Sequence, residues 1–252
     1  MTISLIIMII GSNIIFKENL PSTNQYMDDL LKSRDLQEGT VIYTNYQSEG
    51  RGQIGNKWES EDGKNLLLSI LLMPSMIEPS EQFILSIAIS LGICDFIKRY
   101  IPHCKIKWPN DIYVNDDKIA GILIENSLLE DQIEYSIAGI GVNINQEKFV
   151  SDAPNPVSMT MITGEKYDLN DCLRLLASDL DYRYRQLEAD PDKTRADYYS
   201  NLYKFNGTHR FMDQSGIFSG RIIAVSDSGK LQIEKSPGQV FEYAYKEVDF
   251  KP

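Results

Sequence analysis

Charged side chains that could carry chemistry gather in one stretch of this 252-residue chain, residues 105–125, which reads KIKWPNDIYVNDDKIAGILIE. Lys107, Asp111, Lys118 and Glu125 stand there among apolar residues. Lys118 opens an almost wholly apolar segment, and Gly121 leaves room for another group to approach the backbone closely. The reactive groups of such a site would be cations and carboxylates. An ordinary hairpin with solvated charges has the same pattern, so this stretch alone leaves both interpretations open.

A glycine-rich loop, GRGQIGNKW at residues 50–58, is the second candidate. It satisfies the G-x-G-x-x-G pattern, but no amphipathic helix follows it, as a dinucleotide-binding site requires. Asn56 stands where a phosphate-binding P-loop has lysine. Such a loop can instead close over an anionic ligand, with Arg51 and backbone N–H groups binding its oxygens. The alternative is a plain surface loop.

Two further stretches have residues suited to holding a ligand. Ser22 and Thr23 precede an amphipathic segment, where their hydroxyls either cap a helix or bind a polar ligand. Gly139 and Gly141 alternate along an apolar segment, so both lie on one face and permit close approach of a ligand or a helix.

Other chemistries fit the composition poorly. The chain has two histidines and three cysteines, without a CxxC pair, which disfavours Ser-His-Asp or Cys-His catalysis, a disulfide framework and a zinc site. This cysteine usage suits a reducing cytoplasm. The net charge of −11 argues against a general nucleic-acid surface. The apolar run at residues 3–10 has no signal-peptide pattern and is too short to span a bilayer.

The segments between the candidates alternate between strand and helix patterns. Strands are expected at residues 6–20, 39–47, 65–73 and 132–145, and within 105–125, with residues before Met8 a dispensable extension. Helices are expected from about residue 26, then at 80–100, 169–187 and 194–202, with a loop over 146–161. The pattern predicts an α+β fold: a mixed sheet backed by helices over 1–204, and a small antiparallel β domain over 205–252.

Five motifs, in this order, resemble the biotin–protein ligase family: PSTNQYM at 21–27, GRGQIGNKW at 50–58, KWPNDIYV at 107–114, KIAGILIE at 118–125 and GIGVNIN at 139–145. The similarity covers most of residues 14–252. It implies the class II synthetase-like biotin/lipoate ligase fold, with an SH3-like barrel at the C-terminus. It also implies a biotin–[acetyl-CoA-carboxylase] ligase that uses biotin, ATP and Mg²⁺. Biotin's carboxylate attacks the α-phosphate to give biotinyl-5′-AMP, and a lysine of a biotin carboxyl carrier protein then accepts the biotinyl group.

The resemblance also implies roles for individual residues. Those expected to bind biotin are Ser22, Thr23, Asn24, Gln47, Arg51, Gly52, Gln53, Lys118 and Gly121. Those expected to bind ATP or the adenylate are Arg51, Trp58, Lys118 and Asn143. Those expected to be catalytic are Arg51, Lys118 and Asp111. Lys118 would bridge biotin's carboxylate and the α-phosphate, and Asp111 is assigned, as a hypothesis, to orienting or deprotonating the acceptor lysine. No metal ligand is predicted.

This sequence departs from the family pattern in two places. Gln53 and Asn56 replace two arginines of the GRGRxGR loop that many members have, and Lys246 replaces the glycine of a C-terminal Gly-Glu-Val. Some members carry an N-terminal helix-turn-helix, but the first ligase motif is reached here by Ser22. We therefore expect neither DNA nor a membrane as a partner, while the resemblance leaves room for a homodimer.

Three alternatives remain open at this point. The chain could be a lipoate or octanoate ligase or transferase of the same superfamily, which the KWPND motif and the glycine loop argue against. It could be a non-catalytic biotin-binding protein, although Arg51 and Lys118 are both present. A nicotinamide oxidoreductase would rest on the loop glycines alone.

Overall fold

A computed structural model describes residues 8–53, 55–150 and 155–251 of the chain. Within them, seven strands form one mixed sheet in the order β1-β2-β3-β7-β6-β5-β4. β1 and β2 are parallel, and the other neighbouring pairs are antiparallel. The bounds are β1 Asn13–Leu20, β2 Thr40–Gln47, β3 Leu66–Leu72, β4 Cys104–Lys107, β5 Asp111–Val114, β6 Asp117–Leu129 and β7 Gln132–Val142.

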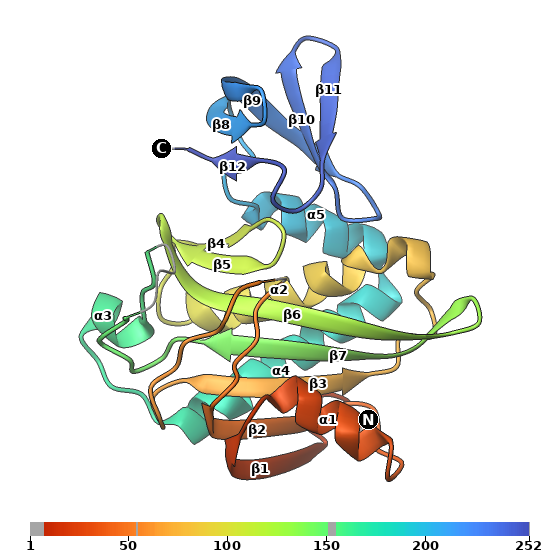
Figure 1. Ribbon diagram of the computed structural model, residues 1–252, viewed down its shortest axis with the longest axis vertical. Coiled ribbons are helices and arrows are strands. Elements are labelled where there is room, and N and C mark those ends of the chain that lie inside the picture. The colour runs from red at the N-terminus through yellow and green to blue at the C-terminus, as the bar shows by residue number, and fades with distance from the viewer. Residues whose placement is uncertain (1–7, 54, 151–154, 252) are drawn as a thin grey trace, which may run out of the picture.

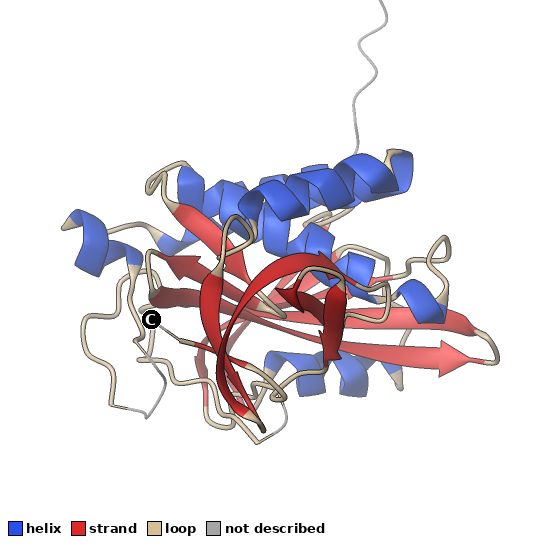
Figure 2. Cartoon of the chain, turned by 90° about the horizontal axis from the view of Figure 1, so that it is seen from above, coloured by secondary structure: helices blue, strands red, loops and turns tan. Residues whose placement is uncertain are grey.

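Helices cover the two faces of this sheet unequally (Figures 1 and 2). The helices α2, α4 and α5 pack against one another on one face, and α1 lies on the other beside β2, β3 and β7. Among the described residues, the face that carries α1 therefore has one helix packed on it, and the opposite face has three. The bounds are α1 Thr23–Leu31, the short 3₁₀ helix η1 Pro79–Glu81, α2 Phe83–Lys98, α3 Met159–Thr163, α4 Leu169–Ala189 and α5 Pro191–Asn201.

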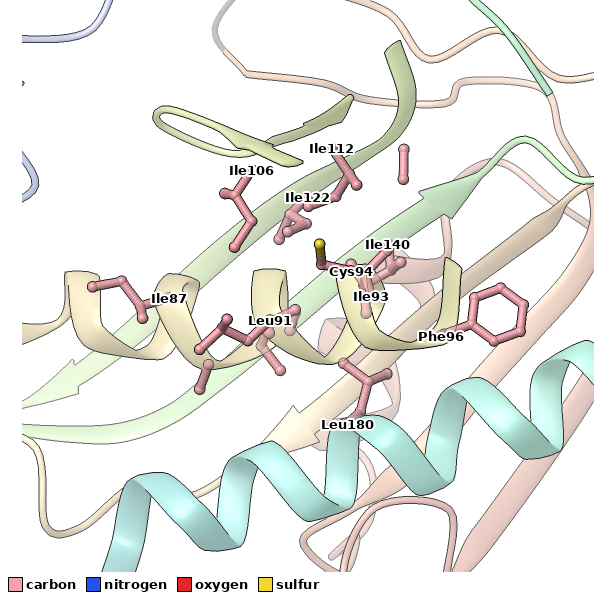
Figure 3. Close-up of a cluster of buried hydrophobic side chains, with 14 of the residues drawn as sticks. Ile87, Leu91, Ile93, Cys94, Phe96, Ile106, Ile112, Ile122, Ile140 and Leu180 are labelled. Atoms are coloured by element: carbon pink, nitrogen blue, oxygen red, sulfur yellow. The ribbon is translucent and has the colours of Figure 1, made fainter. Parts of the chain in front are cut away.

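The core is built around α2, which is packed between the sheet and α4 (Figure 3). Ile87, Leu91 and Cys94 of this helix are buried together with isoleucines of the sheet, and Leu180 of α4 is buried with them. This helix is buried almost all round, because α4 and α5 cover the side that faces away from the sheet.

A second, five-stranded antiparallel sheet has the order β11-β10-β9-β8-β12. Its core residues belong to the same buried cluster as those of the large sheet, and the Trp108 indole N–H donates to the Gly229 carbonyl at 2.8 Å. The predicted small β domain is thus present; its boundary at residues 204 and 205, between α5 and β8, stays a prediction. The bounds are β8 His209–Asp213, β9 Gly216–Val225, β10 Leu231–Ser236, β11 Gln239–Tyr243 and β12 Asp249–Phe250.

Several predicted boundaries were wrong, and the first strand shows the reason most clearly. It begins at Asn13, because the backbone N–H groups of Ile9 and Ile10 donate to Asp181 Oδ1 at 2.7 and 2.9 Å and Gly11 takes a left-handed conformation. These are long-range effects that an apolar run does not reveal. The proposed extension before Met8 falls outside the described residues.

The other shifts are smaller. The first helix starts at residue 23, the expected helix at 80–100 is divided into η1 and α2, and the loop at 146–161 ends inside α3. The last helix starts at residue 191, where the Asp190 side chain accepts from the Lys193 N–H at 2.9 Å and caps it. Within the described ranges, no helix is both long and apolar enough to cross a membrane.

Acid is expected to weaken the small sheet through Asp213. Its carboxylate accepts from Lys235 Nζ at 2.6 Å, the Tyr243 hydroxyl at 2.9 Å and Ser215, and these hydrogen bonds, that of Lys235 foremost, lower the pKa of Asp213. A lowered carboxyl pKa gives stability above the unfolded-state value of about 3.9, which is lost as pH falls toward the folded-state value. Asp213→Asn should therefore lower the urea midpoint at pH 7 and reduce the loss of stability below pH 4. An equal loss of stability in acid for both proteins would contradict this role.

Candidate functional site

A cleft of about 620 Å³ lies on the face of the large sheet that carries α1. It is bordered by the start of α1, the glycine loop, β5, β6, β7 and the turn that follows β11. The structure brings all twelve predicted site residues to this cleft: Ser22, Thr23, Asn24, Gln47, Arg51, Gly52, Gln53, Trp58, Asp111, Lys118, Gly121 and Asn143. Residues spread over 122 positions of the sequence are thus collected in one place, and their individual roles stay predictions.

Strand register explains why the floor of the cleft is open. Gly141 of β7 pairs with Gly121 of β6, which pairs with Asp111 of β5. Two residues along β7, Gly139 pairs with Ser69 of β3. Side chains at paired positions lie on the same face of a sheet. On this face the three glycines therefore leave the backbone uncovered, next to the Ser69 hydroxyl and the Asp111 carboxylate.

A buried polar network occupies one end of the cleft. Ser69 Oγ lies 2.7 Å from Thr23 Oγ1 and 2.5 Å from Asn24 Oδ1. The Thr23 hydroxyl donates to Gln47 Oε1 at 3.1 Å, and Asn24 Nδ2 donates to Glu125 Oε2 at 2.7 Å. Polar groups without access to water need partners, so this network holds the amide and hydroxyl groups in fixed orientations.

The sequence left open whether Ser22 and Thr23 cap a helix or bind a ligand. Ser22 is the N-cap residue of α1, but its side chain makes no capping hydrogen bond. Gln47 supplies one instead, since its Oε1 accepts from the Thr23 backbone N–H at 2.7 Å. Both residues are nearly buried, with 5% of Ser22 and 3% of Thr23 exposed, and both border the cleft. The hydroxyl of Ser22 is therefore not needed by its own helix.

Lys118 and Asp111 form an ion pair in the middle of the cleft, with Lys118 Nζ 2.6 Å from Asp111 Oδ1 and side chains 24% and 21% exposed. The β5–β6 pairing shifts register between Ile112 and Tyr113, an irregularity that re-aims side chains. Backbone hydrogen bonds from Lys118 N to Asn155 O at 2.8 Å and from Val157 N to Lys118 O at 2.9 Å fix the strand at this point. The position of the lysine is thus determined by the fold.

The indole of Trp58 lies directly on the glycine floor. A Cβ atom added at Gly141 would stand 2.4 Å from Trp58 Cε2, and one added at Gly121 would stand 2.8 Å from Trp58 Cζ3. Lys118 Nζ lies 5.7 Å from the centre of the indole, within the range of a cation–π interaction. The sequence predicted open space beside Gly121. The side chains of Trp58 and Lys118 occupy this space.

The glycine loop folds back on itself and lies beside β6. The Gly52 N–H donates to the Asn56 carbonyl at 3.0 Å, and the Trp58 N–H donates to the Gly50 carbonyl at 3.0 Å. Arg51 Nη1 lies 3.4 Å from Glu125 Oε1, and both side chains are 42% exposed. Such an exposed pair contributes little stability, so Arg51 can exchange Glu125 for a ligand oxygen at small cost.

Within the part of the chain that the structure describes, three buried polar atoms at the cleft lack a hydrogen-bond partner: Gln53 Oε1, Trp58 Nε1 and Asn143 Oδ1. A buried donor or acceptor without a partner costs about 1–3 kcal/mol. Such groups are found mainly where a ligand or a water molecule supplies the missing hydrogen bond. These atoms offer one N–H donor and two carbonyl acceptors to a ligand in the cleft.

Lys107 adds another cation at the outer end of the cleft. Its Nζ donates to the Tyr113 hydroxyl at 2.9 Å and lies 5.5 Å from the centre of the Phe250 ring. Burial lowers the pKa of Lys107, and the neighbouring Asp111 carboxylate partly offsets the effect. This amine is thus held between two aromatic rings, one from each sheet.

Sequence reasoning missed several residues of the site. Ser69 was a signal within reach, because it is the lone hydroxyl in the apolar run NLLLSILLM. Glu125 was noticed only as a charge, and Gly139 and Gly141 were seen without their partners. The turn residues Tyr245 and Lys246 also border the cleft, and no local pattern predicts that the small sheet reaches it.

The two β7 glycines provide a matched pair of variants. A Cβ atom at residue 139 would stand 2.4 Å from Asn24 Oδ1, so Gly139→Ala should disturb the polar network, whereas Gly141→Ala should dislodge Trp58. If the cleft holds the substrates that the resemblance implies, each variant should raise the KM of one of them about ten-fold or more: biotin for Gly139→Ala and ATP for Gly141→Ala. Steady-state kinetics, with tryptophan fluorescence to follow Trp58, would check this. Identical kinetic profiles for the two variants would refute the division of the cleft.

Comparisons with known proteins show which family this chain resembles. The model of the biotin/lipoate A/B protein ligase family matches residues 16–143, just over half of the chain. A bifunctional ligase/repressor BirA of Bacillus subtilis is 29% identical over 241 residues, which are 91% of this chain and 72% of that protein. A biotin–protein ligase of Homo sapiens is 33% identical over 141 residues, 54% of this chain and 19% of the human protein.

Among solved structures, the biotin protein ligase from Aquifex aeolicus in complex with biotin and ATP superposes with a TM-score of 0.77 at 24% identity, covering 95% of this chain and 98% of that one. The fold is therefore that of biotin protein ligases, with a mixed sheet, covering helices and a small second sheet. The chain belongs to the biotin/lipoate A/B protein ligase family. The resemblance seen in the five sequence motifs is confirmed.

Proposed function

We propose that this chain is a biotin–protein ligase, which uses ATP to activate biotin as biotinyl-5′-AMP and then transfers the biotinyl group to a lysine. The observation that carries the proposal is the layout of the cleft: a buried polar pocket at Ser22, Thr23 and Asn24 joins a cationic centre at Arg51 and Lys118. The Aquifex relative holds biotin and ATP, and the biotin protein ligase from Leishmania major, with a TM-score of 0.65, holds biotinyl-5-AMP.

The polar pocket suits biotin better than lipoate. Biotin's ureido ring has two N–H donors and a carbonyl acceptor, whereas the dithiolane ring of lipoate has no such groups. The hydroxyls of Ser22 and Thr23 and the amide of Asn24 border the cleft and are nearly buried. A site built to hydrogen-bond one substrate strongly rejects an analogue that lacks the matching groups, because its own polar groups then stay unpaired.

In the first half-reaction, an oxygen of biotin's carboxylate attacks the α-phosphorus of ATP. A P–O bond to that oxygen forms, the P–O bond to the β-phosphate breaks, and pyrophosphate leaves. Negative charge on the phosphoryl oxygens is stabilised by fixed cations. Lys118 Nζ is fixed by Asp111 at 2.6 Å, and Arg51 is held by the exposed Glu125 carboxylate. Lys118 is therefore the preorganised cation, whereas Arg51 has an exposed partner that a phosphoryl oxygen can replace.

In the second half-reaction, the acceptor lysine's amine attacks the carbonyl carbon of biotinyl-5′-AMP. The C–N bond forms, the C–O bond to the phosphate breaks, AMP leaves, and the nitrogen loses a proton. We assign Asp111 to orienting this amine and accepting its proton. The carboxylate is 21% exposed at the cleft, so an incoming ammonium can reach it.

Mg²⁺ would enter with ATP. Among the described residues, no group of three or more His, Cys, Asp or Glu side chains is placed to hold a metal ion. The residues thus do not fit a dedicated metal cage, whereas Mg²⁺ is commonly carried by substrate phosphates and water. The acceptor would be a biotin carboxyl carrier domain, and the net charge of −11 weighs against DNA as a further partner.

Pyrophosphate release separates this function from its alternatives. The protein would be incubated with MgATP and either biotin, lipoate or no acid. Release that depends on biotin supports the ligase, and release with lipoate alone would transfer the chain to the lipoate branch of the family. Tight biotin binding without release would indicate a binding protein.

A further inference from the structure

The turn between the two last strands lies across the glycine loop, although the two segments are nearly 200 residues apart in sequence. Asn56 Nδ2 donates to the Tyr245 hydroxyl at 3.3 Å, and a Cβ atom added at Gly55 would stand 3.8 Å from Lys246 Nζ. Burial and the nearby Asp111 carboxylate raise the pKa of Tyr245. This turn of the small sheet is therefore part of the wall of the cleft.

Lys246 occupies a backbone conformation that favours glycine. Its φ is 69°, in the left-handed region, which disfavours residues with a Cβ atom. The turn is closed without its side chain, since the Glu247 N–H donates to the Ala244 carbonyl at 3.1 Å and the Ala244 N–H donates to Glu247 Oε2 at 2.7 Å. The backbone of the turn therefore gives no reason for a lysine at this position, where the Nζ atom lies 5.6 Å from the centre of the Tyr245 ring.

The charges around the cleft give such a reason. Among the described residues, five cations border it against three carboxylates, with Glu125 a fourth carboxylate beside Arg51, in a chain whose net charge is −11. The cations are Arg51, Lys57, Lys107, Lys118 and Lys246, and the carboxylates are Glu59, Asp111 and Asp249. On the loop segment next to the turn, Gly55 and Asn56 carry no charge. Lys246 brings a cation to that segment from the other sheet.

We propose that Lys246 binds the β- and γ-phosphates of ATP and the pyrophosphate they become, supplying a cation that Gln53 and Asn56 of the glycine loop do not provide. The inference rests on the proposed function. ATP loading would then depend on contact between the two sheets through the Lys246 turn.

Lys246→Gly separates function from stability, because the two effects have opposite signs. Glycine relieves the left-handed strain, so the variant should unfold at the same or a higher temperature. Loss of one charged hydrogen bond should raise the KM for MgATP about ten-fold, with the KM for biotin within two-fold of wild type. Inhibition by pyrophosphate should weaken about as much, and inhibition by AMP should not change. Lys230→Gln removes an exposed lysine of the same region that does not border the cleft, and serves as the control.

An unchanged KM for MgATP in Lys246→Gly would overturn the inference, as would equal weakening of inhibition by AMP and by pyrophosphate. If the wild type shows no biotin-dependent pyrophosphate release, the proposed function fails separately. Calorimetric binding of pyrophosphate to the wild type and to Lys246→Gly then still decides the inference. Binding weakened about ten-fold in the variant supports it, and equal or absent binding in both proteins rejects it.

Discussion

Lys118→Ala is expected to lower the rate of biotin-dependent pyrophosphate release by about 100- to 1,000-fold, the range found when one preorganised donor to a developing oxyanion is removed. The lysine is positioned by its ion pair with Asp111 at 2.6 Å and by backbone hydrogen bonds with residues 155 and 157. In the alanine variant, solvent does not replace the missing ammonium group, because the position is mostly enclosed by the cleft. The side chain of Lys118 is 24% exposed. Single-turnover pyrophosphate release at saturating biotin and ATP would measure the effect.

Lys105→Ala is the control for this variant. It removes a lysine from the same sheet whose side chain is exposed and does not border the cleft, and its release rate should match that of the wild type. Pyrophosphate release within ten-fold of wild type in Lys118→Ala would remove Lys118 from the chemistry of activation.

Asp111→Asn is expected to have the second largest effect, and to act mainly on transfer. A general base contributes about 10²–10⁴ to a rate, and asparagine keeps an acceptor oxygen but cannot take the proton. The ion pair with Lys118 means that activation should also slow, by up to about ten-fold, since the ammonium loses its counter-ion. Transfer from preformed biotinyl-5′-AMP to a carrier domain should therefore slow far more than pyrophosphate release does.

The ratio of the two rates is the decisive quantity for Asp111. Asp131→Asn removes an exposed carboxylate at the β6–β7 turn and should leave both rates unchanged. If Asp111→Asn slows activation and transfer equally, the carboxylate only positions Lys118 and does not assist the acceptor amine.

Local patterns predicted most of this fold because they act over short distances. The buried run of β3, apolar except for Ser69, and the glycine turns of the small sheet each dictate structure within a few residues. The start of β1 was wrong because Asp181, on a helix 170 residues later, uses the backbone of Ile9 and Ile10. Contacts of that kind are set by packing and leave no local pattern.

The same difference between local patterns and long-range contacts applies to the site. Lys118 and the glycine loop could be found from residue type and spacing, and the family motifs extended the set. Ser69 and Glu125 complete the polar network only through pairing across strands and contact with Asn24. Lys246 joins the cleft because the small sheet folds back over the loop, an arrangement that no motif in the chain encodes.

Mass spectrometry of a carrier domain tests the central claim most directly. The protein would be incubated with biotin, MgATP and a biotin carboxyl carrier domain, beside the same domain with its acceptor lysine changed to arginine. We predict one biotinyl group on the acceptor lysine of the first domain and none on the second, with no product when ATP is omitted. A carrier that stays unmodified with biotin, or that is modified only when lipoate replaces biotin, would contradict the account.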